Sequence, residues 1–130
     1  MFKNTLIKAT EAAGVVIKEY FDKQFTISNK EGINNLVTEV DHKSEEVIIA
    51  VIKDAFPSHY ILSEEAGEMA QDSEYKWIID PIDGTVNYAN GIPICCVSIG
   101  LEKNGKMIMG AVFNPFMNEF FWAERGLGAT

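Results

Sequence analysis

The chain has 130 residues and a net charge of −8, with 19 acidic residues against 11 basic ones. Its length and its hydrophobic content of 47% fit one globular domain with its own core. The acidic balance argues against nucleic-acid binding, which needs clustered Lys and Arg. No apolar run approaches the length of about 20 residues that a membrane-spanning helix needs, and no signal-peptide pattern opens the chain. We therefore expect a cytoplasmic protein that contacts neither nucleic acid nor membrane.

Two helices are predicted in the first half of the chain. Apolar residues spaced three and four apart indicate an amphipathic helix over residues 2 to about 22. Gly14 lies inside it, at a cost of about 1 kcal/mol relative to Ala. A second helix is predicted from about Asp41 to Phe56, where Pro57 ends it. Residues 23–37 are polar and predict an extended, mobile loop that holds Lys30.

Strands follow the second helix. The pair Asn104-Gly105 between two apolar segments is the strongest short hairpin signal. A polar, acidic loop is expected over residues 67–75, and residues 126–130 look like the start of another strand or turn. The apolar runs predict strands at residues 60–63, 76–80, 94–102, 106–113 and 119–124. The fold class is α+β, with two N-terminal helices packed on a mostly antiparallel sheet.

The two cysteines, Cys95 and Cys96, are neighbours in the sequence. Adjacent residues on a strand point to opposite faces, so a disulfide between them would be strained. His42 and His59 lie at no zinc-ligand spacing from them. We interpret the cysteines as small, buried, reduced side chains.

Acidic residues stand at the ends of the predicted strands, as Glu64-Glu65 and in the run Asp80-Pro81-Ile82-Asp83-Gly84-Thr85. Mg²⁺ prefers oxygen ligands, commonly one or two carboxylates, and the Ile82 carbonyl adds another oxygen. A short helix that begins at Gly84-Thr85 would offer backbone amides to an anion. Each residue also has an ordinary reading: Asp83 or Asp41 as a helix cap, Asp80 as a turn residue and Lys30 as a solvated lysine.

The segment Trp77-Ile78-Ile79-Asp80-Pro81-Ile82-Asp83-Gly84-Thr85-Val86-Asn87-Tyr88 resembles the signature of the inositol monophosphatases, a family of lithium-sensitive, magnesium-dependent phosphatases. Three further segments resemble that family in the same order along the chain, namely Leu36–Asp41, Ile61–Glu65 and Val97–Gly100. The resemblance implies a layered α/β sugar-phosphatase-like fold. It also implies hydrolysis of a phosphate monoester with two or three Mg²⁺ ions, and inositol monophosphate is the favoured substrate.

The same resemblance implies roles for individual residues. Glu64, Asp80 and the Ile82 carbonyl would hold one Mg²⁺, Asp80 and Asp83 a second, and Glu64 a weaker third. Asp83, Gly84 and Thr85 would contribute to substrate binding, together with Lys30 of a mobile loop. Asp41 and the Thr85 hydroxyl would orient and help to deprotonate the attacking water, so that Asp41, Glu64 and Thr85 form the catalytic group.

Members of the family are about twice as long and carry a further metal-ligand Asp in a Trp-Asp motif. No Trp-Asp pair occurs here, since Trp122 is followed by Ala123. We therefore expect residues 1–130 to form the N-terminal α+β metal-binding domain of such an enzyme, with the C-terminal αβ half absent, a homodimer at full length and little activity for this fragment alone. The alternatives are a phosphatase for histidinol phosphate, fructose bisphosphate or adenosine bisphosphate, and a non-catalytic metal-binding interaction module.

Overall fold

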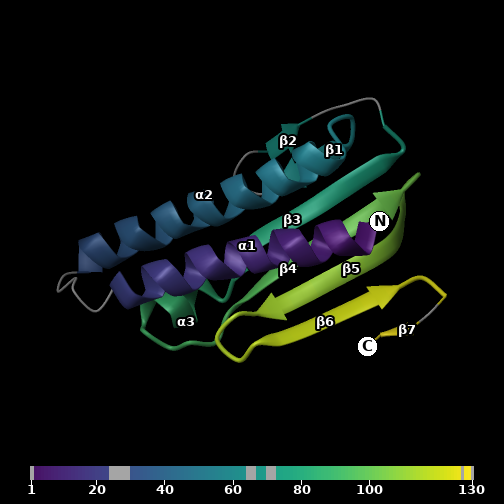
Figure 1. Ribbon diagram of the computed structural model, residues 1–130. Coiled ribbons are helices and arrows are strands. Elements are labelled where there is room, and N and C mark those ends of the chain that lie inside the picture. Colours follow the sequence, from purple (N-terminus) through teal and green to yellow (C-terminus); the bar gives the residue numbers. More distant parts are fainter. Residues whose placement is uncertain (1, 24–29, 64–66, 70–72, 127, 130) are drawn as a thin grey trace.

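The computed structural model describes residues 2–23, 30–63, 67–69, 73–126 and 128–129, and the side chains of residues 2–21, 39–63 and 73–126. Two long helices, α1 (Phe2–Lys23) and α2 (Lys30–Ala55), pack side by side on one face of a seven-stranded sheet (Figure 1). A short helix, α3 (Thr85–Ala89), lies at one end of the sheet. Among the helices of these described residues, none combines the length and the hydropathy that a membrane span requires.

The sheet is mixed but mostly antiparallel. Its strands are arranged in the order β2-β1-β3-β4-β5-β6-β7, and among the described residues only the pair β1–β3 is parallel. The strands are β1 (Tyr60–Ser63), β2 (Gly67–Met69), β3 (Tyr75–Asp83), β4 (Cys96–Lys103), β5 (Lys106–Asn114), β6 (Glu119–Glu124) and β7 (Gly128–Ala129). The predicted α+β class and the two helices on a mostly antiparallel sheet are confirmed.

The predicted loop over residues 23–37 is wrong from Lys30 onward. Lys30 is the first residue of α2, and the segment Leu36–Asp41 lies inside that helix. Apolar residues at positions 33, 36, 37 and 40 already follow the helical spacing that continues to Ile48. Polar residues between these positions interrupt the pattern in the sequence. Once a helix is nucleated, however, the addition of a further turn is favourable.

One of two predictions about the strands is wrong and the other is confirmed. The loop expected over residues 67–75 contains β2, which pairs with β1 in antiparallel register. The hairpin at Asn104-Gly105 is confirmed, since both residues have positive φ, 50° and 83°. Two consecutive positive φ values give the type I′ turn that matches the twist of a two-residue hairpin.

The core lies between the two helices and the sheet. Fully buried side chains come from α1 (Leu6, Ile17), α2 (Ile48, Ile52) and the helix-facing side of the sheet (Ile61, Trp77, Val97, Ile99, Leu101). Gly14 lets α1 approach the end of β5 closely. A Cβ there would lie 2.7 Å from Cε2 of Phe113 and 3.1 Å from Cβ of Pro115. The helix therefore contains this glycine because of packing, which its sequence pattern does not show.

Candidate functional site

The predicted site lies on a bulge near the end of β3. Asp80 and Asp83 both keep partners on β4, but the register shifts between them. Pro81 and Ile82 consequently lie opposite the single residue Val97. An extra residue of this kind leaves backbone groups outside the regular ladder. It also accommodates Pro81, which has no N–H to donate to the ladder.

The bulge brings the two carboxylates to one face of the sheet. In a regular strand, residues three apart point to opposite faces. Asp80 pairs with Ser98, and Asp83 pairs with Cys96. Because Ser98 and Cys96 are two residues apart on β4, they share a face, and cross-strand partners share it with them. Asp80 and Asp83 thus lie on the same side of the sheet, Asp80 half-buried and Asp83 exposed.

The pKa values of the two neighbouring thiols are raised at this end of the sheet. The pKa of Cys96 is raised by burial first, and then by the charges of Asp83 and Asp80. Burial, with the charges of Cys96 and Asp83, raises the pKa of Cys95 to about 12. Both thiols are free, as predicted, with Cys95 buried and Cys96 half-buried. Cys96 therefore lies in the negative field of both carboxylates, which a bound cation would offset.

Gly84 and Thr85 follow the carboxylates and open α3. Gly84 has φ 91° and ψ 37° and is the N-cap of this helix, without a side-chain cap. A Cβ on Gly84 would lie 3.0 Å from the carbonyl oxygen of Ile94 and 3.3 Å from Cα of Cys95. Both the left-handed backbone and the close approach of residues 94–95 therefore require glycine here.

The ordinary readings of the three aspartates do not fit the structure. Asp83 is not the N-cap of α3, because Gly84 occupies that position. Asp80 lies in β3 and not in a turn. Asp41 lies in the interior of α2 and caps neither end of it. None of these carboxylates is therefore explained by helix capping or turn formation.

Asp41 lies in α2, in the helix layer on the other side of the sheet from Asp80. It lies one turn before Ser44, and Ser44 Oγ donates a 2.7 Å hydrogen bond to the carbonyl oxygen of Pro81. Residues three apart share a helix face, so Asp41 lies on the α2 face that is turned toward this segment. Helix α2 also contacts α3, which begins at Thr85.

Two predicted site residues have side chains outside the described part of the chain. Glu64 lies outside the described residues, as does the side chain of Lys30. Ser63, directly before Glu64, is paired with Ile79, directly before Asp80. The Ser63 hydroxyl is buried and has no hydrogen-bond partner within the described part of the chain. Over those same residues, no group of three or more His, Cys, Asp and Glu forms a metal cluster.

The donor set nevertheless suits Mg²⁺. Asp80 and Asp83 are hard oxygen donors on one face of the sheet, on either side of the bulge. Burial raises the pKa values of the neighbouring thiols, Cys95 and Cys96.

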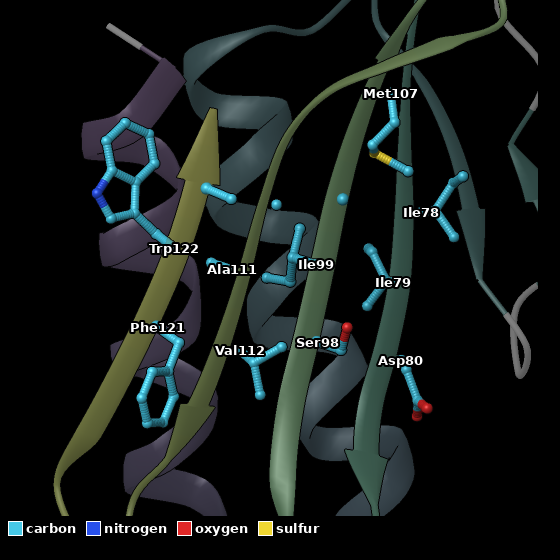
Figure 2. Close-up of a pocket in the computed structure, with 13 residues that line it drawn as sticks. Ile78, Ile79, Asp80, Ser98, Ile99, Met107, Ala111, Val112, Phe121 and Trp122 are labelled. Carbon is cyan, nitrogen blue, oxygen red and sulfur yellow. The ribbon is translucent and has the colours of Figure 1, made fainter. Parts of the chain in front are cut away.

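A shallow apolar groove of about 420 Å³ runs along the open face of the sheet from the site. Figure 2 shows Asp80 and Ser98 toward one end of it and Met107 toward the other, with Phe121 and Trp122 along one side. None of the residues that line it is Lys, Arg or His. The groove therefore offers no cationic side chain to an anionic ligand.

Two residues that hold the site together were missed by sequence reasoning. The first is Ser44, a serine inside a helix pattern with no signal of its own. The second is Tyr88, which is fully buried and whose hydroxyl donates a 2.8 Å hydrogen bond to the carbonyl oxygen of Ile17. This bond fixes α3 to α1. The tyrosine belongs to the recognised signature, but only the packing reveals what it contacts.

The fold and the paired carboxylates define a layered α+β protein with a candidate cation site at the end of its central strands. The sequence profile of the inositol monophosphatase family matches residues 2–130. The chain therefore belongs to the inositol monophosphatase family.

Individual relatives agree with this assignment. A protein of Aquifex aeolicus named fructose-1,6-bisphosphatase/inositol-1-monophosphatase is 46% identical over 93% of this chain and 46% of its own length. The Nus factor SuhB of Haemophilus influenzae is 43% identical over 97% of this chain and 48% of its own. The structure of inositol monophosphatase from Anabaena matches with a TM-score of 0.83 and 42% identity, over 99% of this chain and 46% of that one. The chain thus spans about half the length of the relatives it matches.

Proposed function

We propose that residues 1–130 form the N-terminal α+β metal-binding domain of a Mg²⁺-dependent phosphomonoesterase. The observation that carries this proposal is the bulge of β3, because it brings Asp80 and Asp83 to one face directly before Gly84-Thr85. The family supports the choice of chemistry, since the relatives named above include phosphatases. The groove beside Asp80 has no Lys, Arg or His in its lining, and a bound cation would supply the positive charge that a phosphate dianion needs there.

The proposal gives each residue of the site a task. Asp80, Asp83, Glu64 and the Ile82 carbonyl would hold two or three Mg²⁺ ions. When bound, these ions would lower the pKa of water and offset the charge of the phosphate and the leaving oxygen.

The remaining residues bind and orient. The amides of Gly84 and Thr85, with Asp83 and the Lys30 ammonium, would orient the substrate. The Thr85 hydroxyl would orient the attacking water and pass its proton toward the Asp41 carboxylate.

The substrate that we favour is inositol monophosphate. Fructose bisphosphate is the second candidate, because the Aquifex relative carries both activities in its name. Histidinol phosphate and adenosine bisphosphate complete the panel. Phosphate release from these esters, compared as kcat/KM at saturating Mg²⁺, separates the candidates. Equal values across the panel would contradict a preference for inositol monophosphate.

A non-catalytic interaction role is the second candidate function. It is favoured by one observation, namely that a relative of 43% identity is named as a Nus factor. Measured Mg²⁺ binding without hydrolysis of any ester in the panel would support this role over catalysis. We also propose that the full-length protein is a cytoplasmic homodimer. Sedimentation analysis of the full-length protein would test the dimer.

The deciding experiment replaces Asp80 by Asn in the full-length protein. We expect Mg²⁺-dependent phosphate release to be lost, because a neutral amide cannot replace a ligand carboxylate. Glu102→Gln is the matched control. It also removes one carboxylate charge from the same sheet, but it lies opposite Lys76, near the start of β3. Full turnover by Asp80→Asn would refute the proposed site.

A further inference from the structure

Ser44 makes an unusual contact for a serine inside a helix. Such hydroxyls commonly bond back to a carbonyl three or four residues earlier. Thr10 of α1 does this, with bonds of 2.9 Å to the Leu6 oxygen and 3.0 Å to the Ile7 oxygen. The Ser44 hydroxyl instead crosses from α2 to the sheet and donates to the Pro81 oxygen at 2.7 Å. Like Thr10, Ser44 has no exposed surface.

The bulge explains why the Pro81 carbonyl needs this donor. Pro81 is buried, and it is one of the two residues of β3 that lie opposite the single residue Val97. A bulge disrupts the ladder locally, and a buried carbonyl without a partner is destabilising. The Ser44 hydroxyl supplies a partner from outside the sheet. This bond therefore holds the peptide at the centre of the bulge in one orientation.

The bond lies at the centre of the candidate site. Pro81 directly follows Asp80 and precedes Ile82 and Asp83, so the orientation of its peptide sets where these groups point. On the helix side, Ser44 lies one turn beyond Asp41. A single buried hydrogen bond thus joins the helix that carries Asp41 to the strand that carries the carboxylate pair.

We propose that Ser44 is a positioning residue for the cation site. Its hydroxyl fixes the Pro81 peptide, and through it the relative placement of Asp80, Asp83 and Asp41. The inference rests on the proposed function, since it assumes that Asp80 and Asp83 hold Mg²⁺. Groups that orient metal ligands typically change metal affinity or activity by about 10- to 100-fold when they are replaced.

The test measures Mg²⁺ binding by calorimetry on the full chain, with thermal unfolding in EDTA as a separate measure of stability. We expect Ser44→Ala to raise the Kd for Mg²⁺ by about 10-fold or more, and Ser44→Thr, which keeps the hydroxyl, to restore most of the affinity. Thr10→Ala is the matched control, because it removes a buried helix hydroxyl whose two hydrogen bonds both lie within α1. We expect it to lower thermal stability and leave the Kd unchanged.

The outcomes separate this proposal from the proposed function. If Asp80→Asn abolishes Mg²⁺ binding while Ser44→Ala binds as the wild type does, the site stands and the positioning role of Ser44 is overturned. If Asp80→Asn binds Mg²⁺ as the wild type does, the proposed site fails, and the positioning role fails with it. Should Ser44→Ala not fold, Ser44→Cys decides, because it keeps the size of the side chain with a weaker donor. An unchanged Kd in that variant overturns the proposal, and a raised Kd supports it.

Discussion

Replacing Gly84 by Ala tests whether the turn between the carboxylates and α3 is held by its backbone. The left-handed conformation at φ 91° costs an alanine about 1–2 kcal/mol. The lower entropy of the unfolded alanine chain offsets about 0.4–1 kcal/mol of this. The new Cβ would also meet backbone atoms at 3.0 and 3.3 Å, and overpacking of this kind costs about 1–3 kcal/mol. We expect a total destabilisation of about 2–4 kcal/mol.

Comparison with Gly91→Ala separates the steric part of this effect from the conformational part. Gly91 also has a positive φ, 74°, but a Cβ there would meet nothing within 4 Å. Its replacement should therefore cost only the conformational part, about 1 kcal/mol. Urea denaturation of both variants measures the difference, which we expect to be about 1–3 kcal/mol.

The assay of Mg²⁺-dependent phosphate release adds a functional measure. A displacement of about 1 Å at Gly84-Thr85 can lower the rate about 100-fold, whereas Gly91→Ala should retain activity near that of the wild type. Equal stability losses and equal rates in the two variants would refute the reasoning, because the contact with residues 94–95 would then play no part.

Two further predictions concern the scaffold. Gly14→Ala should destabilise the fold by about 1–2 kcal/mol in urea although alanine favours a helix, because its Cβ would lie 2.7 Å from the Phe113 ring; a stabilised variant would contradict the packing argument. Burial lowers the pKa of His59, and its Nδ1 accepts a 2.9 Å hydrogen bond from Trp77 Nε1. As the pH falls, the unfolded state then binds more protons than the folded state. The free energy of unfolding should therefore keep its full value above pH about 6.5 and decrease as the pH drops from there through the lowered pKa. His59→Phe should reduce this slope and replacement of the exposed His42 by Gln should keep it, as urea midpoints between pH 5 and 8 would show.

The sequence determined the elements that local chemistry specifies. The helical spacing predicted α1, and the Asn104-Gly105 pair predicted the hairpin of β4 and β5, because two left-handed residues in succession are a local requirement. The run from Asp80 to Thr85 was also found from sequence, since carboxylates beside Pro and Gly are a visible pattern. The start of α2 was missed because polar residues interrupt its apolar spacing near Lys30.

The placement of the two carboxylates on one face depends on tertiary contacts. The spacing of Asp80 and Asp83 in the sequence predicts opposite faces for a regular strand, and the bulge against β4 reverses that result. The donor that holds the bulge, Ser44, is 37 residues away in the chain. Both features depend on contacts between segments far apart in sequence. The local sequence therefore identifies the acidic residues. Which of them share a face is determined by the pairing of β3 with β4 and by the packing of α2 on β3.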